Sequence, residues 1–501
     1  MVIDPAFAIG DVHPRLFGAF LEHMGRAVYG GIYEPGHPAA GEDGWRRDVL
    51  EYVRDAGVSI VRYPGGNFVS GYDWEDGVGP RHERPTRLDL AWRSVETNEV
   101  GTDEFLAWAE LAGAEAMLAV NLGTRGVDAA RSLVEYVNAP VGSRHADRRA
   151  ANGRPEPYGV PVWCLGNEMD GPWQLGAKDA VEYGKLANEA GKAMRLVDPS
   201  IELVVVGSSH SSMPTFGAWE STVLDLTWGV ADHISLHTYY DPADFPDVAA
   251  YLGSSLDLDR MITTVAATAD AVAGRRGSRR RLGISVDEWN VWHQQANPQH
   301  LDVSGPFTKA PPLAEDVHDM ADALVVGCML ITLLRHADRV RSACLAQLVN
   351  VIPAIRTQDG GPAWRQTSYW PFLHAARHGH GTVLRVEPSG PAYEVEGEGT
   401  VPGLEATAVH DAGAGTLTVF AVNRLAEPLP VRAVLRDLDG VRVAEHLVLA
   451  DPDIRACNTA EQPDRVVPRP GTGATVDGGV LSVELPPLSW SVLRLAGPAL
   501  R

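Results

Sequence analysis

Residues 160–170, Val-Pro-Val-Trp-Cys-Leu-Gly-Asn-Glu-Met-Asp, decide the fold class that we predict for this chain. A short apolar run ends at a glycine, and the polar side chains of Asn167 and Glu168 follow at once. Such runs are typical of strands that are buried on both faces of a parallel sheet. A carboxylate directly after a buried strand is costly unless it is paired or hydrogen-bonded, so its position demands a reason.

Seven other strand-like runs are spread along the chain. With residues 160–165, we predict strands at 16–22, 58–63, 116–122, 203–207, 233–237, 282–286 and 343–352. Segments of helical spacing lie between them, at 45–56, 103–112, 129–138, 177–197, 258–273 and 315–335. This alternation predicts an α/β fold, a parallel (β/α)8 TIM barrel. A doubly wound open sheet is the main alternative, but the glycine-rich phosphate turn expected after its first strand is missing.

The helical spacing ends near residue 376, and short β-like runs then alternate with Gly, Pro and Asp. This pattern is typical of an antiparallel β-sandwich, here expected to be jelly-roll-like. We predict an N-terminal strand within residues 1–14 that joins the sandwich, a catalytic barrel over 15–375 and the C-terminal β-sandwich over 376–501. The 501 residues, 45% of them hydrophobic, suffice for two cores.

Composition argues against two classes of partner. The net charge is −22, and no basic run beyond the short cluster at 275–281 is long enough to follow a phosphate backbone, so we expect no nucleic acid. The longest apolar helix candidate, 323–334, is far shorter than the roughly 20 residues that span a bilayer, so we expect a buried helix and no membrane. The first residues lack the pattern of a secretory signal. Four scattered cysteines fit a reducing compartment, and we expect a cytoplasmic protein.

A second acidic residue repeats the first arrangement. Glu288 follows the seventh predicted strand, in residues 284–290, Ile-Ser-Val-Asp-Glu-Trp-Asn. The carboxyl ends of barrel strands converge on one face, so Glu168 and Glu288 are expected to line one cleft. Glycoside cleavage needs a carboxylic acid that protonates the departing oxygen and a carboxylate on the other side of the sugar. We therefore predict Glu168 and Glu288 as the catalytic pair.

Other strand ends carry polar side chains that we expect in the same cleft: Glu22, Asn67, Asn121, Asn167, His237, Tyr239 and Gln347. Asn167 is placed to bind a sugar 2-hydroxyl. Tyr239 could donate a hydrogen bond from its hydroxyl to the carboxylate that attacks the sugar. His237, on the same strand, could help to orient that carboxylate. Trp92 and Trp292 are candidates for stacking on sugar faces, with core packing equally open.

Five blocks resemble the α-L-arabinofuranosidases of glycoside hydrolase family 51. They are Arg-Tyr-Pro-Gly-Gly-Asn-Phe at 62–68, Gly-Tyr-Asp-Trp-Glu-Asp-Gly-Val-Gly-Pro at 71–80, Gly-Asn-Glu-Met-Asp-Gly-Pro-Trp at 166–173, Asp-Glu-Trp-Asn-Val-Trp at 287–292 and Gln-Leu-Val-Asn-Val-Ile at 347–352. The resemblance implies a retaining exo-hydrolase, without metal or cofactor, that removes terminal non-reducing α-L-arabinofuranosyl units from arabinan, arabinoxylan or their oligosaccharides. It also implies a homo-oligomer, commonly a hexamer.

The same resemblance implies residue roles. Glu168 would be the general acid/base and Glu288 the nucleophile, while Glu22, Asn67 and Gln347 would bind the arabinose hydroxyls. Segments 241–246 and 293–295 do not match the family pattern and are expected to shape the leaving-group side, which leaves the linkage open.

Two alternatives remain. One is a retaining barrel glycosidase of other specificity, such as a xylosidase, galactofuranosidase or endo-glucanase. The other is a metal-dependent sugar isomerase or sugar-binding barrel in which Glu22, Glu168, His237 and Glu288 are ligands. Elsewhere, His378 with His380 and Asp316 with His318 lack the partners of a zinc site.

Overall fold

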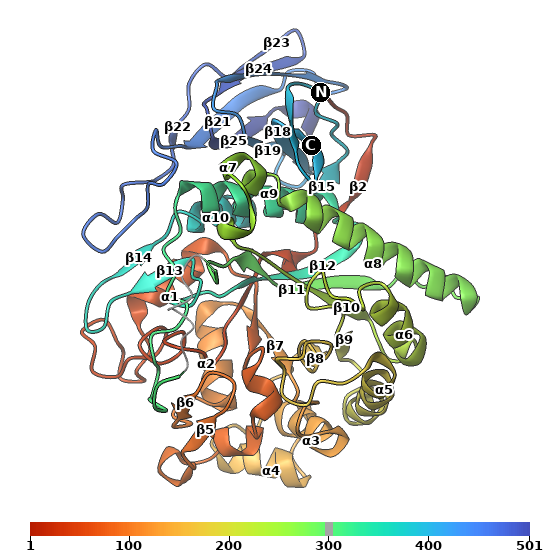
Figure 1. Ribbon diagram of the computed structural model, residues 1–501, viewed down its shortest axis with the longest axis vertical. Coiled ribbons are helices and arrows are strands. Elements are labelled where there is room, and N and C mark those ends of the chain that lie inside the picture. The colour runs from red at the N-terminus through yellow and green to blue at the C-terminus, as the bar shows by residue number, and fades with distance from the viewer. Residues whose placement is uncertain (296–303, 501) are drawn as a thin grey trace.

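Eight parallel strands close into a barrel in the computed structural model, which describes residues 1–295 and 304–500 (Figure 1). The strands are β3 (Gly18–Phe20), β4 (Ile60–Tyr63), β7 (Glu115–Ala119), β8 (Val162–Leu165), β9 (Glu202–Val205), β10 (His233–Tyr240), β11 (Gly283–Val291) and β12 (Val340–Ala346). They pair in chain order, and β12 closes on β3. The predicted TIM barrel is confirmed.

The predicted strand bounds fail most clearly at the last strand. We expected a strand over 343–352, but β12 ends at Ala346, and residues 347–352 form buried turns. An apolar run that is buried on all sides has no period to separate strand from loop. β10 and β11 instead extend beyond the predicted 233–237 and 282–286.

Ten α-helices occur in the described part of the chain. The six predicted ones are α1 (Arg47–Ala56), α2 (Thr102–Ala112), α3 (Val127–Asn138), α5 (Ala180–Val197), α8 (Ser255–Arg275) and α9 (Met320–Arg335). Four were not predicted: α4 (Arg144–Ala151), α6 (Ala218–Thr227), α7 (Val248–Leu252) and α10 (Tyr369–His378). The carboxylate of Asp179 caps α5 by accepting from two backbone N–H groups, and the helix ends before Asp198-Pro199.

Short elements lie outside the main strands and helices. The 3₁₀ turns are Pro14–Phe17, Phe68–Gly71, Trp74–Gly77, Arg81–Glu83, Pro242–Asp244 and, near the C-terminus, Pro498–Leu500. Three two-stranded ribbons are β5 (Arg87–Asp89) with β6 (Ser94–Glu96), β13 (Ile355–Thr357) with β14 (Ala363–Arg365), and β16 (Ala392–Val395) with β17 (Gly399–Pro402). The turn of the β5–β6 ribbon carries Trp92.

Two sheets form the C-terminal part (Figure 1). One contains β1 (Val2–Ile3), β20 (Leu429–Leu435), β24 (Val480–Leu485) and β23 (Thr475–Asp477). The other contains β2 (Ala8–Asp11), β15 (Thr382–Leu384), β18 (Leu404–Asp411), β19 (Thr416–Asn423), β25 (Ser489–Ala496), β21 (Arg442–Leu449) and β22 (Arg469–Pro470). The N-terminal segment thus supplies one strand to each sheet. Pairing is antiparallel except where β1 runs parallel to β20.

Helix α9 joins the two parts because it is buried on every side. Residues 320–334 are all buried, and the helix packs against β18, β19 and β25, as well as against its barrel neighbours. Nearby, the indole Nε1 of Trp490 donates to Nδ1 of His374 on α10 at 3.0 Å. The expectation of a buried helix at 323–334 is confirmed. Among the described residues, no helix combines the length and apolarity needed to cross a membrane.

Candidate active site

The carboxyl ends of the barrel strands surround a cavity of about 290 Å³. Its walls include eight of the eleven predicted site residues, namely Glu22, Asn67, Trp92, Glu168, Tyr239, Glu288, Trp292 and Gln347. A larger, more open hollow of about 940 Å³ lies elsewhere and contains neither member of the predicted catalytic pair. We place the site in the smaller cavity because the ionisable groups converge there.

Glu168 is held at the end of β8 by two donors. Its Oε2 accepts from the indole Nε1 of Trp173 at 2.6 Å, and its Oε1 contacts Nδ1 of His237 at 2.9 Å. The residue has a left-handed backbone, with φ of 41°, which is uncommon for a side chain other than glycine. Backbone strain of this kind clusters at functional sites.

Glu288 lies on β11 and is more enclosed. Arg62 donates to its Oε1 at 2.6 Å, and the Tyr239 hydroxyl donates to its Oε2 at 2.7 Å. Burial raises the pKa of Glu288, while the positive charges of His237 and Arg62 and the hydroxyl of Tyr239 act against that rise. These three partners favour the ionised form of Glu288.

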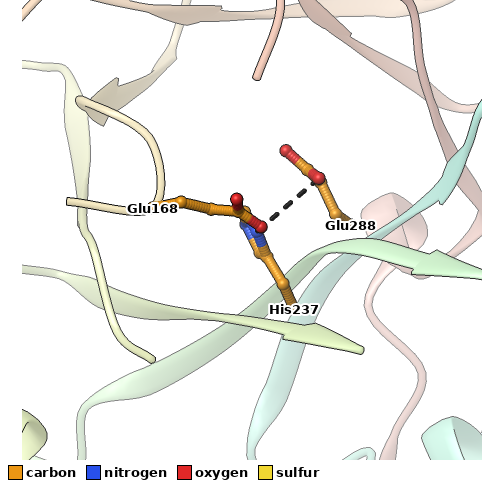
Figure 2. A group of neighbouring side chains, drawn as sticks. All are labelled: Glu168, His237 and Glu288. Atoms are coloured by element: carbon orange, nitrogen blue, oxygen red, sulfur yellow. Dashed lines mark hydrogen bonds and ion pairs between the residues drawn. The ribbon is translucent and has the colours of Figure 1, made fainter. Parts of the chain in front are cut away.

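The two carboxylates face each other (Figure 2). One oxygen of Glu168 and one of Glu288 lie within 4.8 Å of each other, with Nδ1 of His237 in the same group of atoms. Figure 2 shows the imidazole of His237 beneath the pair. Residues 120 positions apart in the sequence are therefore side by side, as predicted from their places at the ends of the fourth and seventh strands.

His237 is a cation between carboxylates. Its Nε2 lies 3.2 Å from Oδ1 of Asp287, and its Nδ1 lies 3.6 Å from Oε2 of Glu288. Burial lowers the pKa of His237, but the charges of Glu288, Asp287 and Glu168 outweigh it and raise that pKa to about 10. The side chain does not line the cavity and supports the carboxylates from below.

Arg62 and Asp287 were not singled out by the sequence analysis. Arg62 lies on β4, is 1% exposed and donates to both Glu288 and Asn167, each at 2.6 Å. Its Nε lies 3.2 Å from Oδ2 of Asp287. A signal existed, because an arginine inside the apolar run Ile-Val-Arg-Tyr requires buried acidic partners.

The opposite wall of the cavity is built around Glu22. Its Oε1 accepts from the backbone N–H of Phe68 and from the indole of Trp92, each at 2.9 Å. The side chain of Gln347 accepts from the backbone of Glu22 at 2.9 Å. Burial, aided by the charge of Glu288, raises the pKa of Glu22 to about 8. Trp92 thus has a polar role that the stacking prediction did not include.

The Gly65-Gly66 pair lets the loop after β4 pass close to the carboxylates. A Cβ on Gly65 would lie 2.6 Å from Cγ of Glu22, and one on Gly66 would lie 3.0 Å from Oε1 of Glu288. These glycines bring Asn67 to the cavity wall. Larger residues would clash with the site itself.

Besides His237, two predicted polar residues do not line the cavity. Asn167 is 1% exposed and lies behind the wall, where its Oδ1 accepts from Arg62. Asn121 was expected in the cleft but does not line it. Its amide binds the backbone oxygen of Tyr72 and the Thr124 hydroxyl, because the loop after β7 folds back on it.

Aromatic rings border the open side of the cavity. The rings of Tyr239 and Trp292 meet edge to face, with centroids 5.1 Å apart. Trp173, which the sequence analysis did not select, is 50% exposed at the mouth and is bonded to Glu168. Nothing distinguished it among thirteen tryptophans, although it stands inside the block 166–173. Gln294 also lines the cavity, from the segment 293–295.

Two family models match the chain. Residues 52–255 match the α-L-arabinofuranosidase 1 domain, and residues 287–489 match the α-L-arabinofuranosidase C-terminal domain.

Relatives match along the whole length. An intracellular exo-α-(1→5)-L-arabinofuranosidase of Halalkalibacterium halodurans is 53% identical, over 99% of this chain and 98% of the relative. An exo-α-(1→6)-L-arabinofuranosidase of Bifidobacterium longum is 48% identical, over 99% of this chain and 97% of the relative. The solved structure of a family 51 α-L-arabinofuranosidase from Bifidobacterium longum superposes with a TM-score of 0.94 at 44% identity and covers 98% of this chain and 99% of its own.

Proposed function

The chain belongs to the α-L-arabinofuranosidases of glycoside hydrolase family 51, and from this we propose an exo-acting retaining hydrolase that releases terminal non-reducing α-L-arabinofuranosyl residues by double displacement. The proposed substrates are saccharides derived from arabinan and arabinoxylan. Two relatives act, by name, on (1→5) and (1→6) linkages, so the family fixes the sugar more firmly than the bond.

The spacing of the two carboxylates is the observation that carries the retaining mechanism. Retaining enzymes hold their carboxyl groups about 5 to 5.5 Å apart, whereas inverting enzymes need roughly 6.5 to 9.5 Å to admit a water molecule. Oxygens of Glu168 and Glu288 lie within 4.8 Å of each other. This gap supports direct attack by a carboxylate on the sugar.

The contacts of each carboxylate support its proposed role. Glu288 would attack the anomeric carbon, because Arg62 and Tyr239 hold its oxygens in place and favour its ionised form. Glu168 would give its proton to the departing glycosidic oxygen. In the second step Glu168 would take a proton from water, whose oxygen attacks the same carbon and frees Glu288.

The wall around Glu22 is proposed to bind the arabinose hydroxyls. Glu22, Asn67 and Gln347 offer polar atoms to the cavity, and Trp92 fixes Glu22. Unpaired polar groups would remain if a sugar lacked the matching hydroxyls, and this penalty gives selectivity. Asn167 would act on the 2-hydroxyl only if the sugar reaches past the present wall.

We propose that segments 241–246 and 293–295 set the linkage preference. Asp241 accepts from the backbone N–H of Gln295, so the two segments are joined, and Gln294 faces the cavity. A homo-hexamer, a cytoplasmic location and the domain bounds 1–14, 15–375 and 376–501 also stay proposals. An intracellular relative supports the location.

The metal-dependent alternative is less compatible with the charges of the site. Atoms of Glu168, His237 and Glu288 lie close enough to ligate one ion. However, Arg62 and the Tyr239 hydroxyl already donate to the two oxygens of Glu288, and the indole of Trp173 donates to Oε2 of Glu168.

A panel of nitrophenyl glycosides tests the proposal. We expect the α-L-arabinofuranoside to be cleaved far faster than the β-D-xyloside, β-D-galactofuranoside and β-D-glucoside, with no loss of activity in chelator. Preference for another glycoside would replace the sugar assignment, and loss of turnover in chelator would favour the metal-dependent barrel.

A further inference from the structure

Asp287 and Glu288 are neighbours in the chain, yet both reach the same two cations. Arg62 places Nε 3.2 Å from Oδ2 of Asp287 and Nη1 2.6 Å from Oε1 of Glu288. His237 places Nε2 3.2 Å from Asp287 and Nδ1 3.6 Å from Glu288. Successive side chains of a regular strand point to opposite faces, so this shared contact needs a cause.

The cause is an irregularity of β11. Its register with β10 shifts, because Ser285 pairs with Ser235 whereas Glu288 pairs with His237. Its register with β12 also shifts, between Val286 and Trp289 of β11. Bulges of this kind re-aim side chains next to active sites. Both carboxylates therefore turn toward the barrel axis, Glu288 on the cavity side and Asp287 below it. Asp287 is 1% exposed and does not line the cavity.

The charges of the cluster do not balance when every carboxyl is ionised. Arg62 and His237 supply two positive charges, while Glu168, Asp287 and Glu288 offer three negative ones, and all five residues are buried. An unpaired buried charge is strongly unfavourable. Neutrality is reached when one carboxyl holds a proton, which is the state that the general acid needs before the first step.

We propose that Asp287 is a positioning residue that, by contact with Nε2 of His237, keeps this imidazole a cation and thus a constant donor to Glu168. The inference rests on the proposed roles of Glu168 and Glu288. With both ring nitrogens protonated, His237 cannot accept the proton of Glu168. The proton then leaves Glu168 only toward the glycosidic oxygen in the cavity.

Other charged and titratable groups near His237 belong to this balance. They are Glu168 and Asp170 after β8, Cys164 on β8, Tyr239 on β10, Arg62 on β4, and Glu288 with Asp287 on β11. Among the acidic ones, only Asp287 contacts Nε2 and stays out of the cavity. Asp287 also has a lowered pKa, because the charges of Arg62 and His237 outweigh its burial. It is therefore a fixed anion through the working pH range.

The direct test measures the proton on His237. In the full-length protein with ¹⁵N-labelled histidine, the His237 signal is assigned with H237Q, and its titration is followed in the wild type and in D287N. We expect the wild-type imidazole to stay protonated up to about pH 10, and D287N to lower that midpoint by about one pH unit or more. Two results would overturn the proposal. One is a wild-type midpoint near 6.5, which can be measured without any variant, and the other is an unchanged midpoint in D287N.

The second readout is the pH profile of kcat/KM. D287N should move the alkaline limb to lower pH by about one unit, because His237 then becomes neutral at lower pH and can accept the proton that the first step needs. Asp103, a partly buried carboxylate that accepts from Tyr136 and Tyr158, provides the matched control D103N, whose profile should not move. An unmoved alkaline limb in D287N would overturn the role in the reaction. If His237 shifts but no arabinofuranoside is cleaved by the wild type, the proposed function fails instead.

Discussion

The hydroxyl of Tyr239 donates a hydrogen bond to Oε2 of Glu288 at 2.7 Å. The other oxygen of Glu288 accepts from Arg62. Both carboxylate oxygens of the proposed nucleophile thus accept hydrogen bonds from donors on two other strands, β10 and β4. A carboxylate held in this way is aimed before substrate arrives, which lowers the cost of reaching the attacking geometry.

Tyr239→Phe should lower kcat/KM by about 10- to 100-fold, since a hydrogen bond to a charged group contributes roughly 1.5 to 3 kcal/mol. The ring contact with Trp292 is retained, so the thermal midpoint should change little. Steady-state kinetics and a thermal melt check this, with Tyr240→Phe as the control on the same strand. Equal kcat/KM of the two variants would show that the Tyr239 hydroxyl does not contribute to catalysis.

Arg62→Met should destabilise the fold by about 3 to 5 kcal/mol, because it leaves Asp287 and Glu288 as buried anions without their main cation. Arg62→Lys keeps the charge but loses the fork that contacts three side chains, so its loss should be smaller. Urea unfolding at pH 7 measures both. Arg154→Met, at an exposed ion pair with Glu110, should change little. A Met variant as stable as that control would contradict the charge account.

Glu22→Gln should alter how stability depends on pH. A carboxyl whose pKa rises from 4.5 to about 8 on folding adds stability below pH 4.5, and this is lost as the pH rises through 8. The amide does not titrate, so the unfolding free energy of the variant relative to the wild type should increase by about 3 to 4 kcal/mol between pH 5 and 9. Denaturant titrations at the two pH values measure it. A constant difference between the proteins would mean that Glu22 is not held protonated.

The sequence predicted the barrel and most of its active-site wall because barrel topology turns chain order into adjacency. Glu168 follows β8 and Glu288 lies in the C-terminal half of β11, and the carboxyl ends of parallel strands share one face. The same rule misplaced Asn121, since a strand-end amide can serve its own loop as well as a ligand. Position at a strand end thus indicates the face but not the direction of the side chain.

The supporting residues were harder to predict. Asp287 should point away from Glu288 by strand alternation, and only the bulge in β11 brings it to His237. A bulge depends on pairing with both neighbouring strands and leaves no local signal. Arg62 was predictable in principle from its place in an apolar run, but its partners lie over a hundred residues away in the sequence.

Glu168→Ala should separate substrates by their leaving groups. Cleavage of saccharides and alkyl arabinofuranosides should fall by about three orders of magnitude or more, because their oxygen needs a proton, while an activated aryl substrate should be affected far less in its first step. Azide should rescue turnover by attacking the glycosyl intermediate without base assistance. Comparing kcat/KM on both substrates checks this, and equal losses would remove Glu168 from the acid/base role.

The covalent step at Glu288 is tested most directly by mass spectrometry of the Glu168→Ala protein, quenched during turnover of an activated aryl α-L-arabinofuranoside. Without its base, the second step should be slow, so one arabinofuranosyl unit should accumulate on the peptide that contains Glu288. Glu288→Gln in the same background should carry none. An adduct on another residue, or none while the aryl substrate turns over, would contradict double displacement through Glu288.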